Sequence, residues 1–218
     1  MRVPVEEALR YLCAADADAE TRRLAEECAE TLEGRLSPRF LWRVFRIGRG
    51  GEGIFLPEAG ISLPGTLAGK MLEDCDAVAL LACTLSAGFD RLEKEWEARD
   101  MARAAVMDTC GSAWTEAVCD EAEQEIRGRF PGRFLTDRFS PGYGDLPLSL
   151  QADFLRALDA GRKLGITANG SFLLLPCKSV TAVIGLSDRP QGAKIRGCAY
   201  CSLRENCEYR TRGETCGV

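Results

Sequence analysis

The chain has 218 residues, which is enough for one substantial hydrophobic core and a small appendage. Apolar residues make up 46% of it and charged residues 28%, as in an ordinary soluble protein. The net charge of −5 makes the chain as a whole a poor binder of nucleic acid or of an anionic membrane. Histidine is absent, which excludes a Ser/His or Cys/His nucleophilic site and a histidine-ligated zinc enzyme.

The sequence predicts a cytoplasmic protein. Residues 1–7 contain no apolar stretch of the kind that a signal peptide needs. The longest apolar run, residues 77–83, is far too short to span a bilayer.

Periodicity predicts the secondary structure in chain order. Helices are expected over residues 4–14, 19–34, 64–73, 86–98, 100–127 and 150–164, strands over 39–47, 76–84, 172–175 and 180–186, and one or two short strands over 54–63. The glycine-rich stretch 48–53 precedes no helix start, so we expect a hairpin loop there rather than a phosphate-binding loop. Because helices and strands alternate irregularly, the sequence predicts an α+β fold with a largely antiparallel twisted sheet flanked by helices.

The loop over residues 137–148 is unusually rich in residues with special backbone geometry. Gly142 and Gly144 allow positive φ or a close approach, whereas Pro141 and Pro147 fix φ. Such a composition is typical of a tightly shaped loop.

Side chains in the same loop suit a small-molecule site. Arg138 can grip a carboxylate in a fork, Gly142 lets the backbone touch a ligand, and Tyr143 can cover it. The alternative is an ordered turn in which Arg138 pairs with Asp137 or Asp145. The chemistry of these residues alone leaves both interpretations open.

The pattern Arg138-x-x-x-Gly142-Tyr143, followed by Pro147 and an amphipathic helix, resembles the S-adenosylmethionine-binding motif of the reactivation domain of cobalamin-dependent methionine synthase. The similarity covers about residues 100–188. It includes Trp114-Thr115-Glu116-Ala117, Lys163-Leu164-Gly165-Ile166-Thr167, Ser171-Phe172, Pro176 and Ser179-Val180-Thr181.

The resemblance implies a role for each loop residue. Arg138 would pair with the methionyl carboxylate of S-adenosylmethionine, and Gly142 and Tyr143 would close on the ligand. Ser140 and Pro141 would shape the loop and add backbone contacts. On sequence alone a solvated helix flank is the safer interpretation of Glu116, and the glutamate becomes a candidate only because it falls where the family has a ligand-contacting glutamate.

Four of the eleven cysteines crowd the C-terminal tail as Cys198-x2-Cys201-x5-Cys207-x8-Cys216. This spacing in a cytosolic chain predicts an all-thiolate metal site, which suits a [4Fe–4S] cluster or a structural zinc ion. Cys216 stands so close to the C-terminus that it is the least secure ligand. The basic residues around the cysteines form either a solvated rim or a docking face for an acidic partner.

We therefore expect two parts, a reactivation-like domain over residues 1–188, with less certain N-terminal helices over 1–36, and a cysteine-rich tail over 189–218. The resemblance implies an activation subunit, of the methyltransferase class, that reactivates cob(II)alamin by reductive methylation. With no histidine to offer cobalt, this chain would act on cobalamin held by a partner methyltransferase or corrinoid protein. A flavodoxin- or ferredoxin-like donor would supply the electron.

Two alternatives belong to other classes of protein. One is a non-catalytic interaction protein whose zinc-stapled tail is the docking piece. The other is an ordinary S-adenosylmethionine methyltransferase, but the glycine-rich loop after a first strand that such enzymes use is not evident in this sequence.

Overall fold

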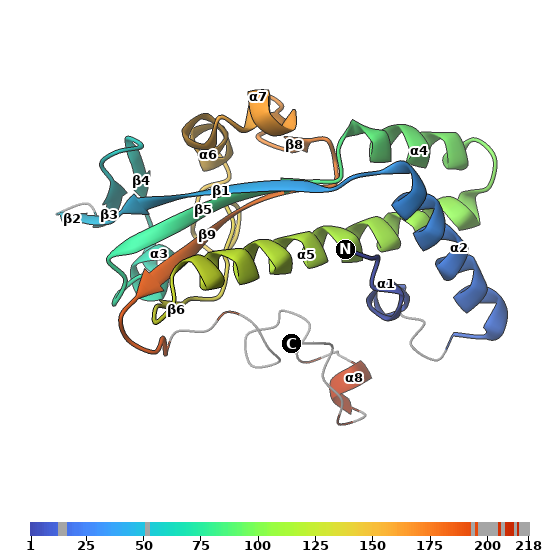
Figure 1. Ribbon diagram of the computed structural model, residues 1–218, viewed down its shortest axis with the longest axis horizontal. Helices are drawn as coiled ribbons and strands as arrows, with labels where there is room; N and C mark the ends of the chain where they lie inside the picture. Colours follow the sequence, from blue (N-terminus) through green and yellow to red (C-terminus); the bar gives the residue numbers. More distant parts are fainter. Residues whose placement is uncertain are drawn as a thin grey trace. The chain divides into compact units, whose positions relative to one another are not determined.

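The computed structural model describes residues 1–12, 17–50, 53–192, 195, 205, 208–211 and 213 (Figure 1). The chain divides into two compact units. Unit 1 comprises Met1–Arg43, Leu81–Ile126 and Ser149–Thr181, and unit 2 comprises Val44–Leu80, Arg127–Leu148 and Ala182–Val218. Helices and antiparallel strand pairs occur together, so the fold is α+β, as predicted.

The largest sheet has four strands in the order β1-β5-β9-β6. They are β1 (Arg39–Arg46), β5 (Ala77–Thr84), β6 (Phe134–Leu135) and β9 (Ser179–Ser187). Strands β5 and β9 are interior strands and almost wholly buried, which explains their unbroken apolar runs. Strand β6 pairs with β9 antiparallel, with Phe134 opposite Ser187.

In unit 1 the helices pack against one another and against β5. They are α1 (Val5–Tyr11), α2 (Ala19–Arg35), α4 (Ala87–Glu97), α5 (Met101–Arg129), α6 (Leu150–Leu158) and α7 (Ala160–Leu164). The Sγ atom of Cys110 on α5 lies 3.7 Å from the carbonyl oxygen of Ala25 on α2. The Sγ atom of Cys83 on β5 lies 3.1 Å from that of Cys119 on α5. The apolar stripe of α5 therefore forms core contacts on two sides.

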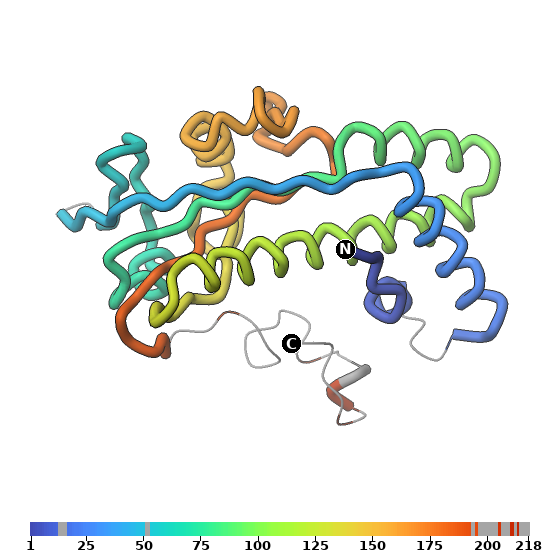
Figure 2. Tube along the Cα trace, in the orientation of Figure 1, coloured from blue at the N-terminus to red at the C-terminus, as the bar shows by residue number. Residues whose placement is uncertain are grey.

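The helix predicted over residues 150–164 is two helices. Asp159 adopts the left-handed conformation, with φ 56° and ψ 36°, and ends α6 before α7 begins. Figure 2 shows the resulting bend in the Cα trace. Gly165 ends α7 at φ 74°, as expected for a glycine at this position. A short antiparallel pair follows, β7 (Thr167–Ala168) with β8 (Leu174–Leu175).

Unit 2 contains an antiparallel meander, β2 (Gly48–Gly50), β3 (Gly53–Leu56) and β4 (Ile61–Leu63) (Figure 1). Because Gly50 pairs with Gly53, the glycine-rich stretch is a hairpin, as predicted. The short helix α3 (Thr66–Met71) follows it, and α8 (Glu208–Thr211) lies near the C-terminus. Among the described residues, no helix is long and apolar enough to cross a membrane.

Candidate functional site

The loop over residues 137–148 follows β6, the strand that pairs with β9 at the end of the four-stranded sheet. Thr136 donates its N–H to the carbonyl oxygen of Gly185 at 3.1 Å and accepts the N–H of Gly185 on Oγ1 at 2.8 Å. Phe139 then exchanges backbone hydrogen bonds with Val183 on β9, at 3.1 and 2.8 Å. The residues on both sides of Arg138 are thus fixed to a buried strand.

Overlapping turns shape the middle of this loop. Tyr143 donates its N–H to the carbonyl oxygen of Ser140 at 3.0 Å, and Leu146 donates to that of Tyr143 at 3.1 Å. Gly142 donates to the carbonyl oxygen of Leu146 at 2.8 Å. Its φ is 91°, and a Cβ atom here would lie 3.0 Å from Cδ1 of Leu148. The conformation therefore favours glycine at position 142, and any side chain there would also have to displace the end of Leu148.

The side chains of the loop differ sharply in exposure. Arg138 is only 8% exposed, whereas Tyr143 is 47% exposed. Pro141 is buried and Ser140 is half-buried. Because a guanidinium keeps its charge at any physiological pH, a buried arginine holds strong donors in a low-dielectric setting. The loop thus combines a buried cation, a close backbone turn and an exposed aromatic ring.

Asp145 is bound to the start of α3. Its Oδ2 atom accepts hydrogen bonds from the backbone N–H of Thr66 at 2.5 Å and from Oγ1 of Thr66 at 2.7 Å. Its Oδ1 atom accepts the N–H of Leu67 at 3.0 Å. The hydroxyl of Thr66 and the two backbone donors lower the pKa of this carboxyl group to about 2.

From the sequence, Asp145 is expected only as a partner for Arg138, and its contact with α3 is not predicted. One signal was present in the sequence. The helix starts after Gly65, which has no side chain to cap it, so its first N–H groups require an acceptor from elsewhere.

Glu116 lies on α5 in unit 1, where its side chain is half-buried. The loop that carries Arg138, Ser140, Pro141, Gly142 and Tyr143 belongs to unit 2. The structure therefore brings these five residues together in one loop, and the participation of Glu116 stays a prediction.

The four tail cysteines proposed as metal ligands, Cys198, Cys201, Cys207 and Cys216, lie outside the described residues. Among the residues that are described, no group of three or more His, Cys, Asp or Glu side chains is arranged to hold a metal ion.

None of the cysteines that the structure describes forms a disulfide, and Cys28, Cys75, Cys83, Cys110 and Cys119 are buried, as is common for this small apolar side chain. Burial raises the pKa of Cys28 and Cys75 to about 11 and that of Cys110 to about 12, so these thiols are poorly reactive. Cys177, by contrast, is exposed, and its Sγ atom lies 3.0 Å from Oδ1 of Asp90.

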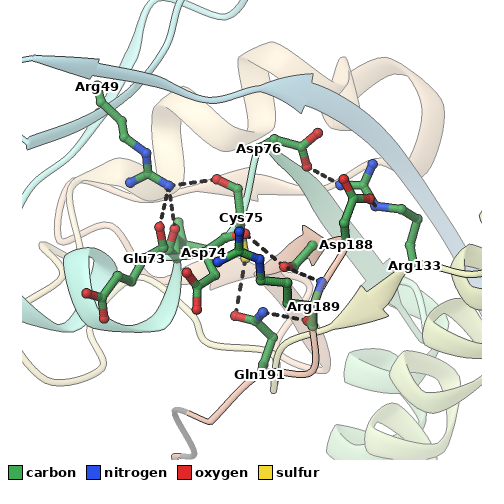
Figure 3. Close-up of polar contacts among 11 residues, drawn as sticks. Arg49, Glu73, Asp74, Cys75, Asp76, Arg133, Asp188, Arg189 and Gln191 are labelled. Atoms are coloured by element: carbon green, nitrogen blue, oxygen red, sulfur yellow. Dashed lines mark hydrogen bonds and ion pairs between the residues drawn. The ribbon is translucent and has the colours of Figure 1, made fainter.

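A polar hollow in unit 2 has a volume of about 290 Å³, and Figure 3 shows the polar side chains around it. Its lining residues are Arg49, Glu73, Asp74, Cys75, Asp76, Ser187, Asp188 and Arg189. Arg133 pairs with both Asp76 and Asp188 at its edge. Arg49 donates to backbone carbonyl oxygens and Arg133 pairs with two carboxylates, so both of these cations already have partners within the protein.

Comparisons with known proteins give a match in structure only. No protein-family model matches the chain, and no curated protein matches it either. Among solved structures, the chain is similar to the crystal structure of the MetH reactivation domain bound to AdoHcy, with a TM-score of 0.62. The match covers 98% of this chain and 81% of the other, at 17% sequence identity. At this identity, the similarity establishes a shared fold.

Proposed function

We propose that this protein binds S-adenosylmethionine in the loop over residues 137–148 and supports the reductive reactivation of cobalamin on a partner methyltransferase. The observation that carries the proposal is an Arg-x-x-x-Gly-Tyr loop, with its arginine buried and its glycine at φ 91°, on a fold like that of a reactivation domain. AdoHcy is the product that S-adenosylmethionine leaves after it loses its methyl group, so the ligand of that neighbour has matching chemistry.

In this proposal Arg138 binds the methionyl carboxylate through its forked donors. Gly142 allows the backbone to approach the ligand, and the exposed Tyr143 covers it. Pro141 and the backbone turn at Ser140 hold the loop in shape. Glu116 accepts a hydrogen bond from the amino group or from a ribose hydroxyl.

This chain needs to position its ligand rather than to move a proton. When the partner is bound, its reduced cobalamin supplies the nucleophile for the methyl group. The residues of this chain then orient the sulfonium and exclude water. No general base is required, which agrees with a sequence without histidine.

The partner in this proposal is a separate cobalamin-binding methyltransferase or corrinoid protein, with a flavodoxin- or ferredoxin-like electron donor. Residues 1–188 carry the ligand site. Cys198, Cys201, Cys207 and Cys216 in the tail hold either a [4Fe–4S] cluster or a zinc ion. A cluster would place a one-electron centre on this chain, whereas zinc would make the tail a structural piece.

The test is calorimetric titration of S-adenosylmethionine and AdoHcy into protein purified without oxygen, with its visible spectrum and metal content measured first. The expected result is saturable binding of both ligands. A matched control is Arg156→Ala, which removes an arginine on α6 whose side chain is 64% exposed. Binding that survives Arg156→Ala but is lost in Arg138→Ala would support the site.

A second measurement tests the reaction itself. The protein is added in trans to a cobalamin-dependent methionine synthase that lacks its own reactivation domain, with a reductant and S-adenosylmethionine. Recovery of methylcobalamin absorbance supports the proposal. A folded, colourless, zinc-containing protein that binds neither ligand would contradict it and would favour the non-catalytic interaction protein.

A further inference from the structure

Helix α3 is too short to be stable alone. It spans six residues, Thr66–Met71, whereas isolated helices need roughly 12–15 residues to be even marginal in water. The buried side chains of Ala68, Met71 and Leu72 anchor it from one side. Its two ends are held by side chains that come from distant parts of unit 2.

Arg49 holds the C-terminal end. Its Nη2 atom donates to the carbonyl oxygens of Leu72 and Glu73 at 2.8 Å and of Cys75 at 2.7 Å (Figure 3). A cation at this end also interacts favourably with the helix dipole. The end of α3 and the turn after it are therefore fixed to the β2 strand.

Asp145 holds the N-terminal end through its three hydrogen bonds to Thr66 and Leu67. The site is closely fitted, because a Cβ atom at Gly65, which has φ 98°, would lie 2.6 Å from Oδ1 of Asp145. An anionic acceptor here satisfies orphan N–H groups and complements the helix dipole. Asp145 therefore acts as an N-cap for α3, although it lies far from this helix in the sequence.

The same contact fixes the candidate ligand loop. Asp145 lies between Gly142 and Leu146, which are joined by a backbone hydrogen bond of 2.8 Å. Gly144, at φ 57°, packs on Leu67 so closely that a Cβ atom would lie 3.1 Å from Cδ2 of Leu67. The carboxylate of Asp145 and the backbone of the loop at Gly144 therefore both contact α3.

We infer that Asp145 is a positioning residue. Its hydrogen bonds fix the loop over residues 137–148 to α3 and so hold Gly142 and Tyr143 in the ligand-binding conformation. Asp145 itself touches no ligand. This inference rests on the proposed function, because it explains how that site is held in shape.

The experiment compares Asp145→Ala with Asp145→Asn in the full-length protein. Asparagine keeps one acceptor oxygen for the first donors of α3, whereas alanine keeps none. Two readouts are needed. Hydrogen exchange of the Gly142, Tyr143 and Leu146 amides reports the loop without any ligand, and calorimetry reports the affinity for AdoHcy.

We expect Asp145→Ala to speed exchange at these amides and to weaken AdoHcy binding by about 5- to 30-fold, the range that corresponds to loss of a cap. Asp145→Asn should restore only part of both properties, because its oxygen can still accept from Thr66 while its NH2 group would face the N–H of Leu67. Thr66→Val should resemble a milder Asp145→Ala, and its effect should not add to that of Asp145→Ala, because both remove the same contact.

Each contrary outcome has a distinct meaning. Unchanged hydrogen exchange of the loop amides in Asp145→Ala would overturn the inference that Asp145 fixes the loop to α3, whatever the affinity for AdoHcy. Faster exchange with unchanged affinity would overturn the positioning role. Failure of the wild-type protein to bind AdoHcy would overturn the proposed function instead, and it would be seen before any variant is made.

Discussion

The guanidinium of Arg49 donates to the carbonyl oxygen of Cys75 at 2.7 Å and closes the C-terminal end of α3. The same nitrogen also donates to the carbonyl oxygens of Leu72, the C-cap of α3, and Glu73, so one side chain binds three carbonyl oxygens at the helix end and in the turn after it. Figure 3 shows these three contacts converging on Arg49.

This relationship predicts the effect of Arg49→Met, which keeps much of the aliphatic stem but removes every donor. We expect the free energy of unfolding to fall by about 1–3 kcal/mol, the range for hydrogen bonds to a charged group. Urea unfolding measures it. Arg46→Met, at an exposed arginine of β1, is the control and should change stability little. Equal losses in the two variants would show that the contacts of Arg49 add nothing.

Arg138 is the residue on which the proposed ligand site depends most. Arg138→Ala should weaken S-adenosylmethionine binding by about 2–3 kcal/mol, because it removes a pair of charge-assisted hydrogen bonds to the ligand carboxylate. Arg138→Lys keeps the charge but not the fork and should recover only part of that affinity. Calorimetry measures both, after thermal unfolding has confirmed that each variant is folded. Full affinity in a folded Arg138→Ala protein would remove this residue from the site.

Some of this fold could be predicted from the sequence, and the failures have physical reasons. Strand β5 and helix α5 were predicted within two residues because each carries a long apolar pattern. The break at Asp159 was missed, since the apolar pattern continues from Leu158 to Ala160 and aspartate gives no fixed signal for a left-handed residue. The two-residue strands β6 and β7 are too short to show any period.

The candidate site could also be predicted only in part from the sequence. Arg138, Gly142 and Tyr143 stand out because their chemistry lies within one short stretch of sequence. The contact between Asp145 and Thr66 joins residues 79 positions apart. Neither residue carries a local pattern that names its partner, so only the folded chain reveals it.

Glu93 provides a test of pH dependence in unit 1. Burial, a hydrogen bond shared with Asp108 and the negative charge of Asp108 raise the pKa of Glu93 from 4.5 to about 7. Lys178 lies beside this pair, 2.6 Å from Oδ1 of Asp108, and partly opposes the shift. Cys177 and Glu97 also face the carboxyl group of Glu93.

Because the folded protein keeps a proton that the unfolded chain releases, stability should fall as pH rises from 4.5 to about 7. Glu93→Gln should remove this part of the slope and make the protein more stable than wild type above pH 7. Urea unfolding at several pH values measures it. Glu30→Gln, at an exposed position of α2, serves as the control. If the free energy of unfolding of Glu93→Gln depends on pH as steeply as that of the wild type, the proton belongs to another group.

Alanine substitutions at Gly111 and Gly128 on α5 should change stability in opposite directions. A Cβ atom at Gly111 would lie 2.2 Å from Cε2 of the buried Phe89 ring and 3.2 Å from Cε of Lys178, so the helix can approach α4 closely only with glycine here. Gly111→Ala should therefore destabilise the protein by about 1–3 kcal/mol through overpacking. Gly128 has no neighbour within 4 Å of such a Cβ, and Gly128→Ala should stabilise by up to about 1 kcal/mol, because alanine is the better helix former. Thermal unfolding of the two variants checks both signs, and a stabilising Gly111→Ala would show that Phe89 can move aside without loss of packing.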